Sequence, residues 1–197
     1  MEKIASLPYD KEITYLESSG TQYIDTGLTG GTNAEYEIRC QVLNTSDNWD
    51  ILFGSKANSS VSAQGVPKLY YHSTNGGRVG ATTIWKGSAQ NIQLLLNTVY
   101  NINTLSFKGG GLYVDDTLKY DLQAQYGFGN KNFWIFADPE ETNYKINMRL
   151  YYAKIWLEGT LVRDFIPVRV GQVGYLYDKV NGVLYGNSGT GNFILGE

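Results

Sequence analysis

Strict alternation of apolar and polar residues over positions 34–42 is the sequence feature that most constrains this fold. Apolar side chains stand at every second position, with charged or polar ones between them, in the run Ala-Glu-Tyr-Glu-Ile-Arg-Cys-Gln-Val. A period of two places one set of side chains on a buried face and the other set in water. The run therefore predicts a long strand in an antiparallel sheet with one solvated face.

The composition also favours strands over helices. The chain has 197 residues, of which 14% are aromatic, with 16 Tyr and 23 Gly but only 2 Met. Aromatic side chains suit a pleated, half-buried surface, and glycines suit the turns between strands. The length fits one domain, so we predict a single domain over residues 1–197 with its core from about residue 13 to about residue 193.

Turn residues separate many further runs of strand character. They lie at 13–17, 22–25, 51–54, 68–72, 79–84, 93–96, 100–107, 112–114, 118–120, 133–136, 146–157, 161–167, 173–177 and 183–185. Residues 92–99 fit either one helix or two strands with a turn at Asn97-Thr98. We favour the strands because Asn is a poor helix former. Short strands without intervening helices predict an all-β sandwich or barrel.

Four short connections have the composition of hairpin turns. They are Gly109-Gly110, Asp115-Asp116, Glu158-Gly159 and Asn181-Gly182. Gly, Asn and Asp accept the positive φ that tight hairpin turns require. The chain is therefore predicted to meander from strand to neighbouring strand.

Charge excludes two classes of partner. Lys and Arg number 16 against 19 Asp and Glu, a formal net charge of −3, and neither sign is gathered into a block. Binding to a nucleic-acid backbone or an anionic membrane would require a basic stripe. No apolar run approaches the length of a membrane span or of a signal-peptide core, so we expect neither membrane insertion nor a cleaved signal.

Two stretches of the sequence indicate a particular protein family more specifically than the overall composition does. The first is residues 15–27, Tyr-Leu-Glu-Ser-Ser-Gly-Thr-Gln-Tyr-Ile-Asp-Thr-Gly, and the second runs over residues 152–168 and continues to 174–182. Together they resemble the concanavalin A-like, laminin-G-like jelly-roll domains of prophage and phage tail-associated proteins from gut bacteria. Between them, residues 96–100 and 112–116 resemble that fold's central hairpin region. Such a fold carries lectins, glycan hydrolases and structural modules alike.

The resemblance implies a jelly-roll β-sandwich of two antiparallel sheets. In it the first and last segments pair, with turns at Gly20, Gly159 and Gly182. Arg163 and Asp164 are adjacent in an extended run, so they face opposite ways and each is expected to meet a structural partner elsewhere. The resemblance also implies a protein made in a bacterial cytoplasm that reaches the virion or the extracellular space without a signal peptide, through lysis.

Familiar catalytic patterns are missing. Glycoside hydrolysis normally needs two flanking carboxyl groups, and glucanases of this fold carry Glu-x-Asp-x-x-Glu on one strand, which this sequence lacks. Its nearest acidic clusters are Glu35/Glu37, Asp47/Asp50, Asp115/Asp116 and Asp138/Glu140/Glu141. Glu35 and Glu37 share a strand face, which we interpret as solvated surface. We therefore predict a protein that is not an enzyme.

The single His72 and single Cys40 limit other chemistry. A Ser-His-Asp or Cys-His system would have to use His72, and Cys40 lies on the apolar face of its strand, where thiols are inert. Two such residues do not make a zinc site. We predict no catalytic residue, no metal and no cofactor, with calcium at the oxygen-rich residues 44–50 as the alternative.

Recognition of another molecule at the protein surface is the class of function that remains. Trp and Tyr stack on the apolar faces of sugar rings, while Asn, Asp and Gln hydrogen-bond the hydroxyl groups. The predicted carbohydrate-binding residues, aromatics and their polar neighbours in loop-like settings, are Trp49, Asp50, Tyr71, His72, Trp85, Tyr126 and Asn130. Ordinary packing is the alternative for each of them, and Trp134 and Trp156 are assigned to the core.

The sequence thus predicts a non-enzymatic module that recognises a cell-surface glycan as part of a phage tail or prophage assembly. Its partners would be that glycan or other tail proteins, and it could form oligomers. One alternative is a purely structural virion protein whose aromatic surfaces, Trp49 and Trp85 among them, are contacts between protomers. The other is a glycoside hydrolase with an unfamiliar carboxylate arrangement.

Overall fold

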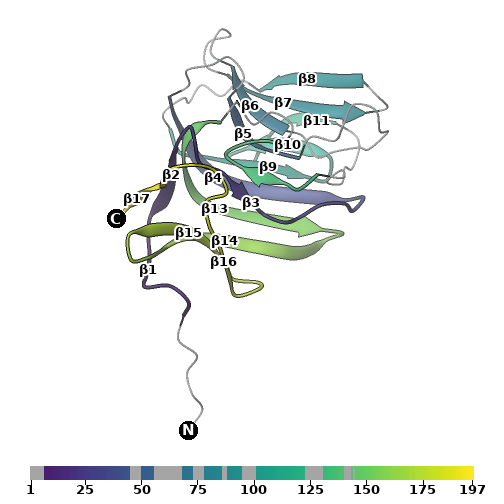
Figure 1. The fold of residues 1–197 in the computed structure, drawn as a ribbon. Helices are drawn as coiled ribbons and strands as arrows, with labels where there is room; N and C mark the ends of the chain where they lie inside the picture. Colours follow the sequence, from purple (N-terminus) through teal and green to yellow (C-terminus); the bar gives the residue numbers. More distant parts are fainter. Residues whose placement is uncertain are drawn as a thin grey trace.

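The computed structural model describes residues 7–44, 50–55, 68–72, 78–85, 88–94, 101–122, 131–139, 143 and 145–197. Within these ranges the regular elements are all strands, as Figure 1 shows. No helix in this part of the chain is long and apolar enough to cross a membrane. The predicted all-β class is confirmed.

The described residues form two sheets, of which the larger contains eleven strands. Its order is β11 (Thr117–Asp121), β10 (Gly111–Val114), β9 (Asn103–Lys108), β4 (Ala34–Asn44), β13 (Asn147–Leu157), β14 (Thr160–Val170), β15 (Val173–Asp178) and β16 (Val183–Tyr185). Three short strands extend it: β1 (Lys11–Glu12) on β14, β2 (Tyr15–Ser19) on β13, and β17 (Ile194–Gly196) on β2. The alternating run that predicted a strand is β4, and it lies in the middle of this sheet.

The smaller sheet contains six strands within the same described ranges. They are, in order, β3 (Ile24–Asp25), β12 (Trp134–Ile135), β5 (Ile51–Gly54), β6 (Lys68–His72), β7 (Arg78–Trp85) and β8 (Ser88–Leu94). β8 is antiparallel to β7, with Ser88 opposite Trp85. This confirms a strand rather than a helix over residues 92–94, while the predicted turn at Asn97-Thr98 lies outside the described residues. The strand begins five residues before the predicted Gln93 because backbone pairing extends it through a polar stretch without apolar alternation.

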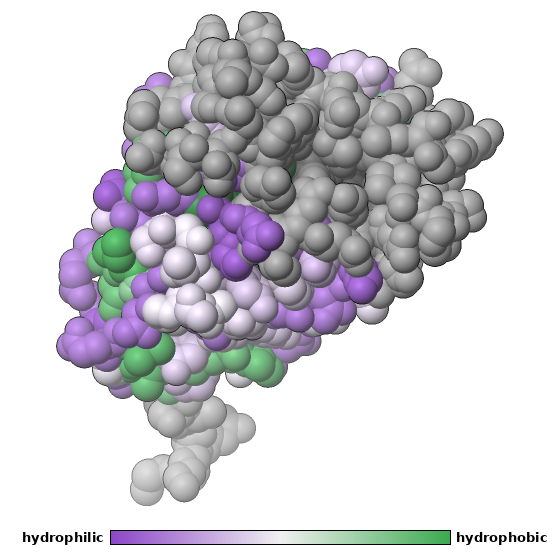
Figure 2. Space-filling model, turned by 45° about the horizontal axis from the view of Figure 1, so that its top comes forward, coloured by the Kyte–Doolittle hydropathy of each residue, from purple (hydrophilic) through white to green (hydrophobic). Residues whose placement is uncertain are grey.

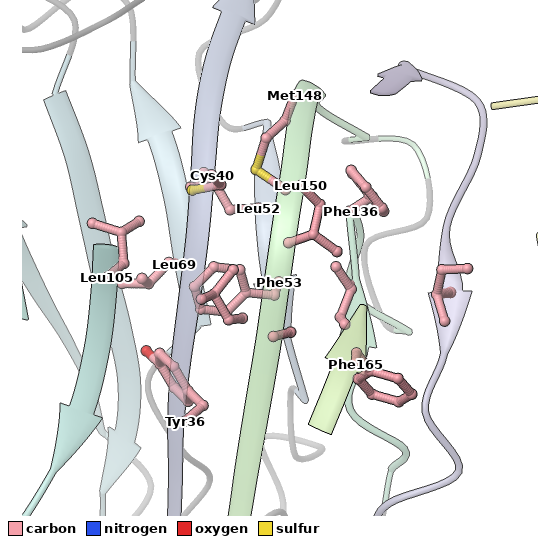
Figure 3. Packing of buried hydrophobic residues seen from close by; sticks show 14 of the residues in the cluster. Tyr36, Cys40, Leu52, Phe53, Leu69, Leu105, Phe136, Met148, Leu150 and Phe165 are labelled. Atoms are coloured by element: carbon pink, nitrogen blue, oxygen red, sulfur yellow. The ribbon is translucent and has the colours of Figure 1, made fainter. Parts of the chain in front are cut away.

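The core lies between the sheets, and aromatic rings fill its centre (Figure 3). Tyr36 on β4 is 1% exposed and meets the ring of Phe53 on β5 edge-on, with centroids 5.0 Å apart. Phe107 and Phe133 pack on the same Tyr36 ring at 6.0 and 5.9 Å. Such contacts add to the stabilisation from burying the rings. Cys40 is buried on the same face of β4, and this burial raises the pKa of its thiol to about 12.

Three of the predicted hairpin turns have two central residues with positive φ. The φ values are 56° and 81° at Gly109 and Gly110, 47° and 60° at Asp115 and Asp116, and 50° and 75° at Glu158 and Gly159. This geometry matches the right-handed twist of the strands on either side. Glu158 adopts it although it has a Cβ, and its carboxylate accepts the backbone N–H groups of Thr32 and Asn33 at 2.6 and 3.1 Å.

The first and last segments pair, as the resemblance implied. β17 is antiparallel to β2, with Leu195 opposite Leu16. A side-chain hydrogen bond also links the two segments: the amide nitrogen of Gln22 donates to the carbonyl oxygen of Asn192 at 2.8 Å. Gln22 is buried, with 2% of its surface exposed. The described part of the face shown in Figure 2 is largely hydrophilic, with small and separate hydrophobic patches.

Candidate functional site

The outer face of the larger sheet carries the polar side of β4. The alternation that turns Tyr36 and Ile38 inward turns Glu35 and Glu37 outward. β9 and β13 flank β4 and present residues on the same face. In register, Glu37 stands between Ser106 on β9 and Lys154 on β13. Three segments far apart in the sequence therefore meet on one surface.

A hollow of about 250 Å³ lies on this face, and we call it the β4 basin. It is lined by Glu35, Tyr36, Glu37, Ser106, Phe107, Lys108 and Trp156. Tyr36 and Phe107 belong to the core, where each is 1% exposed. The accessible side chains that a ligand would meet are therefore two carboxylates, an ammonium group and an indole, because Ser106 is only 4% exposed.

Among the described residues, one neutral donor orients each carboxylate. Glu35 Oε1 accepts the backbone N–H of Gly109 at 2.8 Å, from the β9–β10 turn. Glu37 Oε1 accepts the hydroxyl of Tyr152 on β13 at 3.0 Å. Burial, followed by this hydrogen bond, raises the pKa of the Tyr152 hydroxyl. A protonated Tyr152 therefore remains a donor to Glu37 well above neutral pH.

The nearby ammonium groups point toward aromatic rings. Lys108 Nζ lies 3.5 Å from Asp116 Oδ1 and 5.0 Å from the centroid of the Tyr113 ring. Lys154 Nζ lies 5.7 Å from the centroid of the Tyr152 ring. Within the described residues, neither Glu35 nor Glu37 forms an ion pair.

Trp156 is the aromatic wall of the β4 basin, and its assignment to the core is wrong. It is partly exposed, and it makes no hydrogen bond or ring contact with another described residue. Its neighbours Ala153 and Ile155 face the core, so alternation along β13 sends Trp156 outward with Lys154. That alternation was the signal that could have placed it.

Trp134 is also partly exposed rather than in the core. It stacks on Tyr23 with centroids 4.2 Å apart and an interplanar angle of 23°. The two rings cover each other, which leaves less of either ring face for a ligand than at Trp156. Sequence reasoning missed both Trp residues because strand propensity predicts a strand but not its outward face.

Two predicted carbohydrate-binding residues lie inside the protein. Tyr71 is 7% exposed and Asp50 is 2% exposed, and the backbone N–H of Tyr71 donates to the carbonyl of Asp50 at 2.7 Å. Tyr71 is in β6, the strand predicted over residues 68–72, and alternation from Leu69 turns its side chain inward rather than toward a ligand. Neither side chain is open to a glycan, because both are covered by the sandwich.

For the other five residues, a role in carbohydrate binding stays a prediction. His72 ends β6 opposite Arg78, and Trp85 ends β7 opposite Ser88. Trp49, Tyr126 and Asn130 lie outside the described residues. Most of the oxygen-rich segment considered for calcium also lies outside them. Across the described ranges, no three His, Cys, Asp or Glu side chains come together as a metal site would require.

Comparison with known proteins rests on structure, since neither a family model nor a curated protein sequence matches the chain. A solved structure of a "putative carbohydrate binding protein" from Bacteroides ovatus superposes with a TM-score of 0.57 and 14% identity, over 94% of this chain and 60% of that one. A heptameric SAP-like pentraxin from Limulus polyphemus gives a TM-score of 0.48 and 9% identity, over 97% of this chain and 93% of that one.

The fold is a lectin-like jelly roll. The Bacteroides likeness, at this identity, concerns the fold alone, and the chain spans about 60% of that protein's length. Within the jelly roll, the β4 basin is a hollow on an open sheet face. The fold does not fix the chemistry of this basin, which depends on the residues that line it.

Proposed function

We propose that this chain is a non-enzymatic module that binds a glycan in the β4 basin. The observation that carries the proposal is Trp156, a partly exposed indole without described partners, beside two outward carboxylates. A pyranose ring presents an apolar CH face that stacks on an indole, while its hydroxyl groups donate to carboxylates.

The shape of the basin fits one sugar ring of a longer chain. Its volume of about 250 Å³ is below the roughly 300–1,000 Å³ of pockets that enclose a whole small molecule. A shallow site on a sheet face leaves both ends of a polysaccharide free to continue. Affinity at such a site comes from one stacked ring and a few hydrogen bonds, so we expect weak binding that repeated copies would strengthen.

We also propose that the module works in a phage tail or prophage assembly, outside the cell that makes it. The support is the resemblance of residues 15–27 and 152–182 to domains of such proteins. Mass spectrometry of purified particles from an induced lysogen tests this setting. Peptides of this chain that co-sediment with tails support it, and their presence only in the cell lysate supernatant argues against it.

A glycan array followed by titration calorimetry tests the binding function. We expect Trp156→Ala to lose about fivefold to tenfold in affinity, because loss of a stacked ring costs roughly 1–1.5 kcal/mol. Tyr175→Ala is the matched control, since Tyr175 is a partly exposed aromatic on β15, two strands away from β13. Absence of binding to any glycan at millimolar concentration would overturn the proposal, as would equal effects of both substitutions.

Hydrolysis is the second candidate, because both carboxylates line the basin. Glu35 and Glu37 are two residues apart on one strand, which separates their Cα atoms by about 6.6–6.8 Å. Paired glycosidase carboxyl groups lie roughly 5–9.5 Å apart. Release of reducing sugar from a bound polysaccharide, abolished by Glu35→Gln or Glu37→Gln, would establish an enzyme. Binding without release supports the binding module.

A further inference from the structure

We propose that two copies of this chain pair through the outer edge of the larger sheet, with β11 of one copy antiparallel to β11 of the other. The inference goes beyond glycan binding, because it names an interaction surface and its partner and does not require a sugar in the β4 basin. It follows from three properties of β11: the exposure of its side chains, the direction of its backbone groups, and its distribution of charge.

β11 is the end strand of the larger sheet. Within the described ranges it pairs with β10 along one side only, and β8 of the smaller sheet approaches it without joining the ladder. All five of its residues are exposed. Two of them are large and apolar: Leu118 is 49% exposed and Tyr120 is 42% exposed. An open edge strand with exposed apolar side chains is a template for pairing with another strand.

The pairing with β10 sets which backbone groups of β11 point outward. The N–H of Leu122 donates to the carbonyl of Gly110 at 2.9 Å, so the peptide groups of Leu122 point toward β10. This direction alternates along an antiparallel strand, so the peptide groups of Tyr120 also point toward β10. Those of Asp121 and Lys119 point away from β10, toward the side on which a second strand would add.

Charge selects one register for two copies of β11. Residues that exchange hydrogen bonds must both point outward, so the two-fold axis passes through Lys119, Tyr120 or Asp121. An axis at Lys119 places two ammonium groups opposite each other, and an axis at Asp121 places two carboxylates there. An axis at Tyr120 instead places Lys119 of each copy opposite Asp121 of the other. Opposite charges across two strands stabilise the pair, and like charges destabilise it.

A lysine or a bulge on an edge strand usually discourages pairing with other strands. Lys119 is the extra residue of the bulge in the β10–β11 ladder, and it forms no ion pair with a described residue. In the register centred on Tyr120 its charge is compensated by a carboxylate, so the residue that disfavours other edges favours this one. Leu118 then lies opposite Leu122, and the two Tyr120 residues face each other across the axis.

This pairing joins the two larger sheets into one and places both β4 basins on the same face. The two-fold axis is perpendicular to the sheet, so the outer faces of the two copies are continuous. β4 is three strands from β11 in each copy, so about seven strand spacings, or roughly 33–34 Å, separate the two β4 strands. A surface that carries many copies of one glycan could then hold both basins at once, which strengthens binding without a new contact.

Sedimentation velocity of the whole chain, from about 0.01 to about 1 mM and without glycan, tests the pairing. The shared edge is short, so we expect a weak dimer whose fraction rises with concentration. Lys119→Glu and Asp121→Lys should each remove the dimer, because each places like charges opposite each other. A mixture of these two variants should form a heterodimer, because both of its cross-strand pairs again have opposite charges.

Lys11→Glu is the control, since it changes the net charge equally and Lys11 lies on β1, beside β14 and away from β11. Circular dichroism melts show whether each variant is folded. Slower hydrogen exchange at the N–H groups of Lys119 and Asp121 as concentration rises supports a contact on β11. A monomer at every concentration overturns the inference, as does a dimer that either single variant leaves intact or that Lys11→Glu also removes. Monomeric single variants whose mixture stays monomeric overturn it too.

Discussion

Arg163 and Asp178 form an ion pair where β14 meets β15, with Arg163 Nε 3.6 Å from Asp178 Oδ2. The Asp178 side chain is fully buried, and its Oδ1 also accepts the backbone N–H groups of Asp164 and Val180, each at 3.0 Å. Asp164 faces the other way and pairs with Lys179 at 3.0 Å. This confirms the expectation that Arg163 and Asp164 face opposite ways and meet structural partners elsewhere.

Asp178→Ala should destabilise the protein strongly. It leaves a nearly buried guanidinium group without its carboxylate partner and two backbone N–H groups without their acceptor, a loss of roughly 3–5 kcal/mol in the free energy of unfolding. Asp164→Ala, at the more exposed pair with Lys179, should cost about 1 kcal/mol or less. Urea unfolding of both variants measures the difference. Similar small losses for the two would contradict the structural role assigned to Asp178.

Cys40 should be inert in the folded protein. Burial raises the pKa of its thiol to about 12, so the reactive thiolate is scarce near neutral pH and the sulfur is covered by the core. A chromogenic disulfide reagent at pH 8 should label the native protein slowly and the protein in denaturant at once. Rapid labelling of one thiol without denaturant would show that β4 does not hold Cys40 inside.

Glu158 should make stability depend on pH in the acid range. Hydrogen bonds from the N–H groups of Thr32 and Asn33 lower the pKa of its carboxyl group. A carboxyl group with a lower pKa in the folded state stabilises the fold fully above its unfolded pKa, about 4.3, and loses this contribution as pH falls through the folded value. Glu158→Gln should therefore melt below the parent protein at pH 7.

The melting-temperature difference between Glu158→Gln and the parent should shrink as the pH falls below 4, because protonation removes the charge that the substitution removes. Glu12→Gln supplies the comparison at an exposed position. A difference that is constant from pH 7 to pH 3 would mean that the charge of Glu158 contributes nothing and that only side-chain shape matters.

Gly189 should not tolerate a side chain. A Cβ at this position would collide with the backbone carbonyl oxygen of Thr21, which cannot move without disturbing the segment between β2 and β3. Gly189→Ala should lower stability by about 1–3 kcal/mol, the usual range for overpacking. Ser188→Ala is the neighbouring control. Thermal melts of the two variants give the comparison, and a Gly189→Ala protein as stable as the control would show that the loop adapts.

Local sequence patterns predicted the strands and turns but not the site. Alternation over β4 identified Glu35 and Glu37 as one face, and turn residues identified the two-residue hairpins. The β4 basin, however, needs Lys108 and Trp156 beside Glu35, and the order of strands in a sheet is set by pairing between distant segments. Tyr71 was assigned to a binding surface because of its polar neighbours, although alternation with Leu69 along the predicted strand over residues 68–72 turns it inward.

The most direct test of the central claim is an amide and indole NMR titration with the glycan that binds most tightly on the array. A glycan in the β4 basin should shift the indole N–H of Trp156 and the backbone N–H of Gly109, which donates to Glu35, more than the N–H of Tyr71 or Asp178. Shifts that cluster at those first two signals are the predicted result. Unchanged signals for Trp156 and Gly109 at saturating ligand would contradict the account.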